Sequence, residues 1–181
     1  MTIDCPLDCG YLIAAHRYEV QHRKPPAVSE IPFADVEFSP DLIHEQGPVV
    51  SGFGYAILKA AAAAGAAADA DALAALQALA ETYRTLGSGI YYEKPPAGGP
   101  PLEIYGALVK FLEDYKKAAA ERGGAARLKD TDIFHLLVFL LRVGRQQTNG
   151  RPRSRMFLEF LRSQFPREAV AQQEAPRIIV P

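Results

Sequence analysis

The run "IFHLLVFLL", residues Ile133–Leu141, is the longest strongly apolar stretch of the sequence and decides which fold it predicts. Its nine residues are interrupted only by His135, and a membrane-spanning helix would need about 20. A helix that is apolar on nearly every side is normally buried by several neighbours. The run therefore predicts the central helix of a compact bundle, beginning at Asp130 or Thr131 and ending at Gly144.

Apolar residues recur at helical spacing in four other stretches, which predicts a helix at each. The clearest pattern begins at Asp69 or Asp71, either of which can cap the helix, and ends at Gly87. Three more helices are expected over residues 53–64, 102–121 and 154–165. The residues expected to face inward are Leu73, Leu76, Leu79, Tyr83 and Leu86, then Tyr105, Leu108, Leu112 and Tyr115, and finally Met156, Phe157, Phe160, Leu161 and Phe165.

The first 50 residues are acidic and give a weaker pattern. Residues 4–23 fit either a strand or a helix and favour the helix, whereas the proline-rich residues 24–38 are typical of an extended connector. Ser39 and Pro40 predict the start of a two-turn helix, which Gly47 would end.

With 181 residues the chain has the length of one domain. We expect an all-α bundle of about five to six helices with long irregular connections and an N-terminal region that can be extended. Its parts are an irregular region over 1–50, a helical core over 51–167 and a tail over 168–181. The tail ends in "RIIVP", which would dock on its own domain or on a second copy in a homo-oligomer.

The N-terminus lacks the basic start and apolar run of an export signal. Two cysteines are too few for a disulfide framework. These observations predict a cytoplasmic protein that does not contact a membrane.

Positive charge is concentrated after the central helix. Between Arg142 and Arg167 there are seven arginines and one acid, Glu159, although the whole chain carries a net charge of −1. We call the segment Arg145–Arg155, "RQQTNGRPRSR", the arginine turn. Asn149 and Gly150 predict a tight turn within it, because both residue types tolerate positive φ.

The arginines cluster at an electrostatically unfavourable place. If Ser154 is the N-cap of the last helix, positive charges lie beside the positive end of its dipole and cost about 0.3–1 kcal/mol each. A bound anion would reverse the sign of this term, because N–H groups and guanidinium groups converge on phosphate or carboxylate. The anion-binding residues expected on this basis are Arg145, Asn149, Arg151, Arg153, Ser154 and Arg155.

Two explanations of the cluster remain open at this stage. The arginines can pair internally with acids, for example Asp35, Glu37, Asp41 and Glu45, as charge clusters often do. Alternatively, the arginine turn contacts an anionic partner: a nucleic-acid backbone, a phosphorylated ligand or an acidic protein. Nucleic acid is less favoured, since the linker is longer than the 3–4-residue turn of a helix-turn-helix. The second explanation describes a binding or adaptor protein without enzymatic activity or cofactor.

A metal-dependent enzyme is the main alternative, and a structural homo-oligomer without a ligand is a further one. Three histidines follow an acid by three residues, and such pairs share one helix face and supply ligands in metal-binding bundles. The candidate ligands are His22, Asp41, His44, Asp132 and His135. We favour the interpretation without metal, because a closed ligand set is not evident.

Other chemical motifs are weaker still. Cys5 and Cys9 precede two histidines, but the gap between the pairs is shorter than in a zinc finger. The sequence contains neither a phosphate-binding loop nor a nucleophile elbow.

Overall fold

The computed structural model describes residues 31–121 and 128–166, together with Ala14 and Tyr18. The chain divides into two compact units, residues 1–31 and 32–181, and the helices named below belong to the second. The expectations for residues 4–23, including Cys5, Cys9 and His22, lie outside the described residues, as does that for the tail after residue 166. The single domain expected for residues 1–181 stays a prediction.

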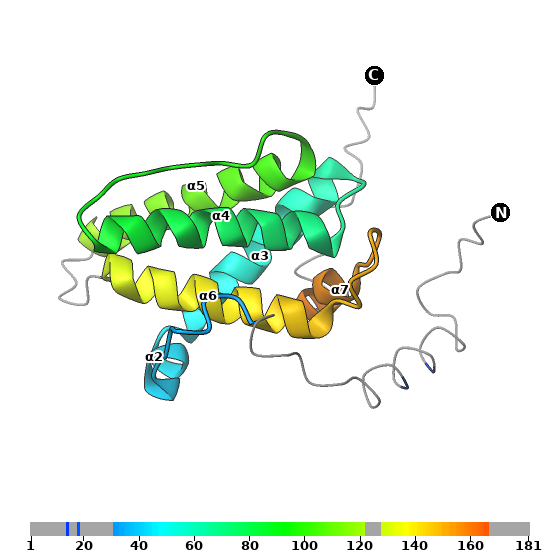
Figure 1. The fold of residues 1–181 in the computed structure, drawn as a ribbon, viewed down its shortest axis with the longest axis horizontal. Coiled ribbons are helices and arrows are strands. Elements are labelled where there is room, and N and C mark those ends of the chain that lie inside the picture. Colours follow the sequence, from blue (N-terminus) through cyan, green and yellow to red (C-terminus); the bar gives the residue numbers. More distant parts are fainter. Residues whose placement is uncertain (1–13, 15–17, 19–30, 122–127, 167–181) are drawn as a thin grey trace, which may run out of the picture. The chain divides into compact units, whose positions relative to one another are not determined.

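The described part of residues 32–181 contains six α-helices and no strand (Figure 1). This confirms the all-α bundle of five to six helices. In chain order the helices are α2 (Pro40–Glu45), α3 (Gly47–Ala64), α4 (Asp69–Gly87), α5 (Gly99–Glu121), α6 (Asp130–Gln147) and α7 (Met156–Ser163). No helix among the described residues combines the length and the apolar composition needed to cross a bilayer.

The predicted central helix is α6, which packs along α4 and against α7. The two long helices are antiparallel: Thr131 at the start of α6 lies beside Gly87, and Gly144 near its end lies beside Leu73. Phe134 makes an edge-to-face contact with Phe33, at 5.4 Å between ring centroids. The core residues of α6 are Ile133, Phe134, Leu136, Leu137, Val138, Leu140 and Leu141, all buried as expected.

Gly144 does not end α6, which continues to Gln147. Its role is close packing, because a Cβ at this position would lie 2.6 Å from Leu73 Cδ2 and 3.0 Å from Phe157 Cε1. The glycine thus allows α4, α6 and α7 to meet at one point. A comparable contact joins α3 and α5, where the ring of Phe111 lies over Gly52.

The boundary between α2 and α3 also differs from the prediction. Ser39 caps α2 as expected, with its Oγ accepting from the Asp41 N–H at 3.1 Å. α2 ends directly before Gly47 as expected, with Gln46 as its C-cap, but Gly47 also begins α3, which was not predicted there. The helical core therefore starts before residue 51, because Pro48 occupies the first turn of α3, where a missing N–H has no cost.

Residues 88–98 connect α4 to α5 and run along the length of both helices (Figure 1). Glu93 fixes this connection to α5, since its carboxylate accepts from the hydroxyls of Tyr91 at 2.5 Å and Tyr105 at 2.7 Å. These two hydrogen bonds lower the pKa of Glu93. Burial, reinforced by the bond to Glu93, raises the pKa of Tyr105 to about 12.

Candidate functional site

The arginine turn links the end of α6 to the start of α7. Its bend is stabilised by Asn149, whose Oδ1 accepts from the Arg151 N–H at 3.0 Å. Gly150 has a φ of 73°, a left-handed conformation that glycine adopts without strain. Asn149 and Gly150 therefore form the predicted turn, although positive φ is confined to the glycine.

A carboxylate from α4 caps the start of α7. Asp69 is 1% exposed, and its Oδ1 accepts from the N–H groups of Phe157 at 3.1 Å and Leu158 at 3.2 Å. Its Oδ2 accepts from the Ser154 hydroxyl at 2.5 Å, and its own N–H donates to the Ser154 carbonyl at 2.7 Å. A buried acid thus satisfies the N–H groups that a helix start leaves without intrahelical partners.

The role expected of Ser154 was therefore wrong. The N-cap of α7 is Arg155, whose side chain makes no capping hydrogen bond, and Ser154 lies one residue earlier, 6% exposed. Its hydroxyl orients Asp69 and makes only a long contact, 3.5 Å, with the Met156 N–H. The negative charge expected at this helix end is supplied by the chain itself, so an external anion is not needed there.

Arg142 is also satisfied within the chain. Its Nε donates to the Pro32 carbonyl at 3.1 Å, and its Nη2 donates to the carbonyls of Phe33 and of Val36, the latter at 2.9 Å. The guanidinium lies over the ring of Phe38, 5.1 Å from its centroid. Arg142 therefore holds the segment before α2 against α6, which is a structural role.

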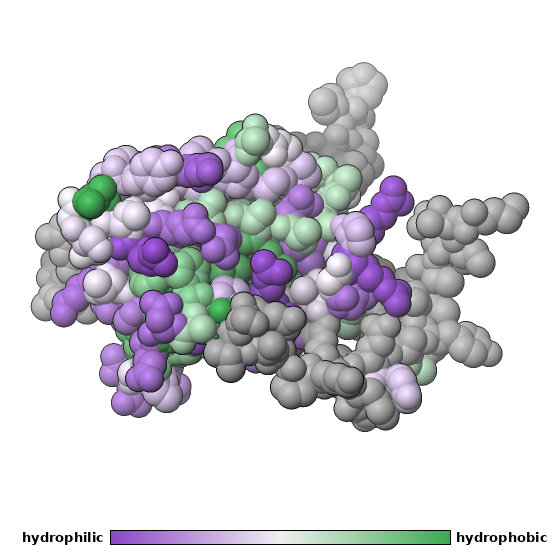
Figure 2. Space-filling model, in the orientation of Figure 1, coloured by the Kyte–Doolittle hydropathy of each residue, from purple (hydrophilic) through white to green (hydrophobic). Residues whose placement is uncertain are grey.

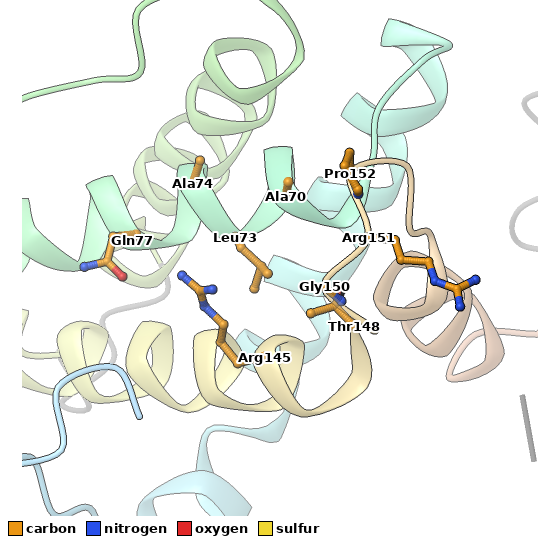
Figure 3. Close-up of a pocket in the computed structure, with 9 residues that line it drawn as sticks. All are labelled: Ala70, Leu73, Ala74, Gln77, Arg145, Thr148, Gly150, Arg151 and Pro152. Carbon is orange, nitrogen blue, oxygen red and sulfur yellow. Dashed lines mark hydrogen bonds between the residues drawn. The ribbon is translucent and has the colours of Figure 1, made fainter. Parts of the chain in front are cut away.

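Arg145, one helical turn further on, lies in a different environment. It is exposed and lines an open pocket of about 300 Å3 between α4, the end of α6 and the following turn (Figure 3). Its guanidinium makes no hydrogen bond or ion pair with the described residues. The lining residues are Ala70, Leu73, Ala74, Gln77, Arg145, Thr148, Gly150, Arg151 and Pro152.

The other arginines of the turn lie outside this pocket or at its edge. Figure 3 shows the guanidinium of Arg151 directed away from that of Arg145, towards α7. Arg153 and Arg155 are exposed, and neither side chain pairs with a carboxylate in the described part of the chain, Glu159 included. Figure 2 shows hydrophilic side chains at both ends of this face, with an apolar area over the middle of the bundle.

Internal pairing, one of the two explanations of the cluster, is not observed among the described residues. The ion pairs between described residues are Lys110–Asp114 and Lys116–Asp130, and both lie away from the arginine turn. The acids proposed as partners, Asp35, Glu37, Asp41 and Glu45, make no ion pair with the arginines in this part of the chain.

The candidate metal ligands do not come together among the described residues. His44 lies on α2, His135 lies on α6, and no group of three or more potential ligands is present in the described ranges. Asp132 has a local role instead, because its Oδ2 accepts from the Lys129 N–H at the start of α6. His135 is partly buried beside the ring of Phe134.

Sequence reasoning missed Asp69 as a cap for another helix and the α4 side of the pocket. One signal was available in the sequence, because α4 begins with two acids where one can cap the helix. In the structure Asp71 accepts from the Ala68 N–H, which leaves Asp69 for another partner. The pocket residues Leu73 and Gln77 had no such signal, because they also fit an ordinary amphipathic helix. The chain matches no protein-family model, no curated protein and no solved structure.

Proposed function

We propose that this protein is a non-enzymatic binding protein that contacts an anionic partner through the arginine turn. One observation carries the proposal: Arg145, Arg153 and Arg155 are exposed around one connection, and none of them pairs with a carboxylate among the described residues. Guanidinium groups present several donors in a fixed geometry, which suits carboxylate and phosphate.

The size of this surface favours an acidic protein segment over a nucleic-acid backbone. Proteins that bind duplex DNA with strong salt dependence neutralise about 6–10 phosphates. The arginine turn offers fewer charges, on a single connection, and the neighbouring surface in Figure 2 is partly apolar. An acidic segment needs fewer charge contacts and can also use the apolar area.

The test is a binding measurement with a fluorescent polyglutamate peptide and, separately, a duplex DNA of equal charge, over a series of salt concentrations. We expect Arg153→Gln/Arg155→Gln to weaken peptide binding at least tenfold at low salt and to reduce the salt dependence. The matched control is Lys110→Gln/Lys117→Gln on the exposed face of α5, which removes the same charge elsewhere.

Equal affinity of the two double variants would refute the assignment of the site to the arginine turn. Tighter binding of DNA than of polyglutamate would make a nucleic-acid backbone the partner. The cytoplasmic location and the homo-oligomer expected from the sequence stay predictions.

A further inference from the structure

The pocket beside Arg145 has an apolar wall formed by one side of α4. Leu73 and Ala74 follow Ala70 by three and four residues, and all three line it. Leu73 is held in place because its side chain packs at Gly144 of α6. This wall is therefore rigid and favours a ligand with an apolar body.

The charge in the pocket comes from Arg145. Figure 3 shows its guanidinium between α4 and α6, whereas the guanidinium of Arg151 is directed elsewhere. The pocket lies between the C-terminal end of α6 and the first turns of α4, so the opposed dipoles of these two helix ends largely offset each other there. One guanidinium then suits one negative charge better than two.

Gln77 reinforces this limit on the ligand's charge. Its Nε2 donates to Glu81 Oε1 at 2.8 Å, so its amide oxygen is the atom left to face a ligand. Figure 3 shows this oxygen on the side of Arg145. An acceptor oxygen with a carboxylate behind it disfavours a phosphate dianion at this position.

The volume limits the ligand to a small molecule or a terminal fragment. About 300 Å3 is at the lower end of the range for ligand pockets. At about 30 Å3 per water-sized group, the pocket holds on the order of ten non-hydrogen atoms.

We infer that the pocket between α4 and α6 binds a monocarboxylate on a short, branched apolar body, with Arg145 on the carboxylate and Leu73 against the apolar part. The inference rests on the proposed function and specifies the ligand chemistry at one part of the same site. Two sources share this chemistry: a free carboxylic acid and the C-terminal residue of a peptide.

Titration of the full chain with 4-methylpentanoate, followed by NMR of the backbone amides, tests the inference. We expect millimolar affinity, with shifts confined to the start of α4, the end of α6 and residues 148–152. The neutral amide of the same acid and inorganic phosphate should bind at least tenfold more weakly. N-acetyl-alanyl-leucine, compared with 4-methylpentanoate, distinguishes a peptide terminus from a free acid, and the C-terminal amide of this dipeptide is the control without a carboxylate.

Two variants separate this inference from the proposed function. Arg145→Gln removes the charge, and Ala74→Phe fills the pocket at an exposed position without changing charge. Both should abolish 4-methylpentanoate binding, and Ala74→Phe should leave polyglutamate binding unchanged. Ala62→Phe, at an exposed position on α3, is the matched control.

The inference would be overturned if 4-methylpentanoate did not bind, or if Ala62→Phe and Ala74→Phe bound it equally well. Either result would leave the proposed function standing. If Arg153→Gln/Arg155→Gln binds polyglutamate as tightly as the unchanged protein, while 4-methylpentanoate still binds beside Arg145, only the proposed function is overturned. Preference for inorganic phosphate would also overturn the assigned ligand class.

Discussion

Arg142 and Arg145 lie three residues apart on α6, yet their surroundings differ completely. The guanidinium of Arg142 donates to three backbone carbonyls and covers the ring of Phe38. The guanidinium of Arg145 faces an open pocket and makes no hydrogen bond with the described residues. A cluster of like charges in a sequence can therefore combine structural residues with residues that are available for binding.

The same contrast separates Ser154 from Arg153 and Arg155. Ser154 is buried and bonded to Asp69, whereas its two neighbours are exposed. We distinguish an inner group, Asp69, Arg142 and Ser154, from an outer group, Arg145, Arg153 and Arg155. Substitutions in the inner group should change stability, and substitutions in the outer group should change binding.

The largest effect is expected for Asp69→Ala, which leaves the Phe157 and Leu158 N–H groups and the Ser154 hydroxyl without their shared acceptor. We expect the free energy of unfolding to fall by about 3 kcal/mol, since hydrogen bonds to charged groups each contribute about 1.5–3 kcal/mol. Chemical denaturation measures this loss.

The control is Asp71→Ala, because Asp71 accepts from one backbone N–H, that of Ala68 at 2.8 Å. Removing this cap should cost about 1 kcal/mol. Equal losses for the two variants would contradict the special role of Asp69.

The next largest effect is expected for Arg142→Met, which keeps much of the apolar stem and removes the three hydrogen bonds to carbonyls. We expect a loss of about 2 kcal/mol, with faster amide hydrogen exchange near residues 33–38. Arg142→Lys should recover only part of it, since an ammonium group cannot reproduce the fork of a guanidinium. If Arg142→Met were as stable as the unchanged protein, Arg142 would not belong to the inner, structural group.

A much smaller effect is expected for Arg145→Met, although this substitution makes the same chemical change on the same helix. The free energy of unfolding should stay within about 0.5 kcal/mol of that of the unchanged protein, because the side chain is exposed. Thermal denaturation of Arg142→Met and Arg145→Met in parallel measures the difference directly. A loss at Arg145 as large as that at Arg142 would show that Arg145 also has a structural role.

The smallest effect concerns Glu93, a carboxylate that is satisfied but exposed. Its pKa is lowered by the hydroxyls of Tyr91 and Tyr105, so its contribution to stability is present above the ordinary value of 4.5. That contribution is lost as pH falls through the lowered pKa. Glu93→Gln should therefore reduce the melting temperature slightly at neutral pH and not at all in strong acid.

Glu103→Gln on the exposed side of α5 is the matched control, with no change expected at either pH. If Glu93→Gln lowered the melting temperature equally at neutral and acidic pH, the hydrogen bonds of Glu93 would not depend on its ionisation.

The sequence predicted the helices wherever apolar periodicity and local caps acted together. The burial of residues 133–141 and the cap at Ser39 are examples. The failures concern interactions between distant parts of the chain. Gly144 has the residue type of a helix terminator, but packing by Leu73 and Phe157 keeps it inside α6.

The candidate site shows the same limit. A connection between two helices was correctly predicted, although its first residues, 145–147, belong to α6. The partner of Ser154 is Asp69, 85 residues earlier. Local patterns assign Asp69 to its own helix, and only the three-dimensional structure brings the two residues together. The binding role of the exposed arginines stays a prediction.

The reciprocal bonds between Asp69 and Ser154 imply a constraint on how this sequence can diverge. A change at either position leaves a buried polar group without its partner, so the two should change together in any lineage that keeps the fold. Paired substitutions at such widely separated positions would identify distant relatives whose overall similarity has been lost.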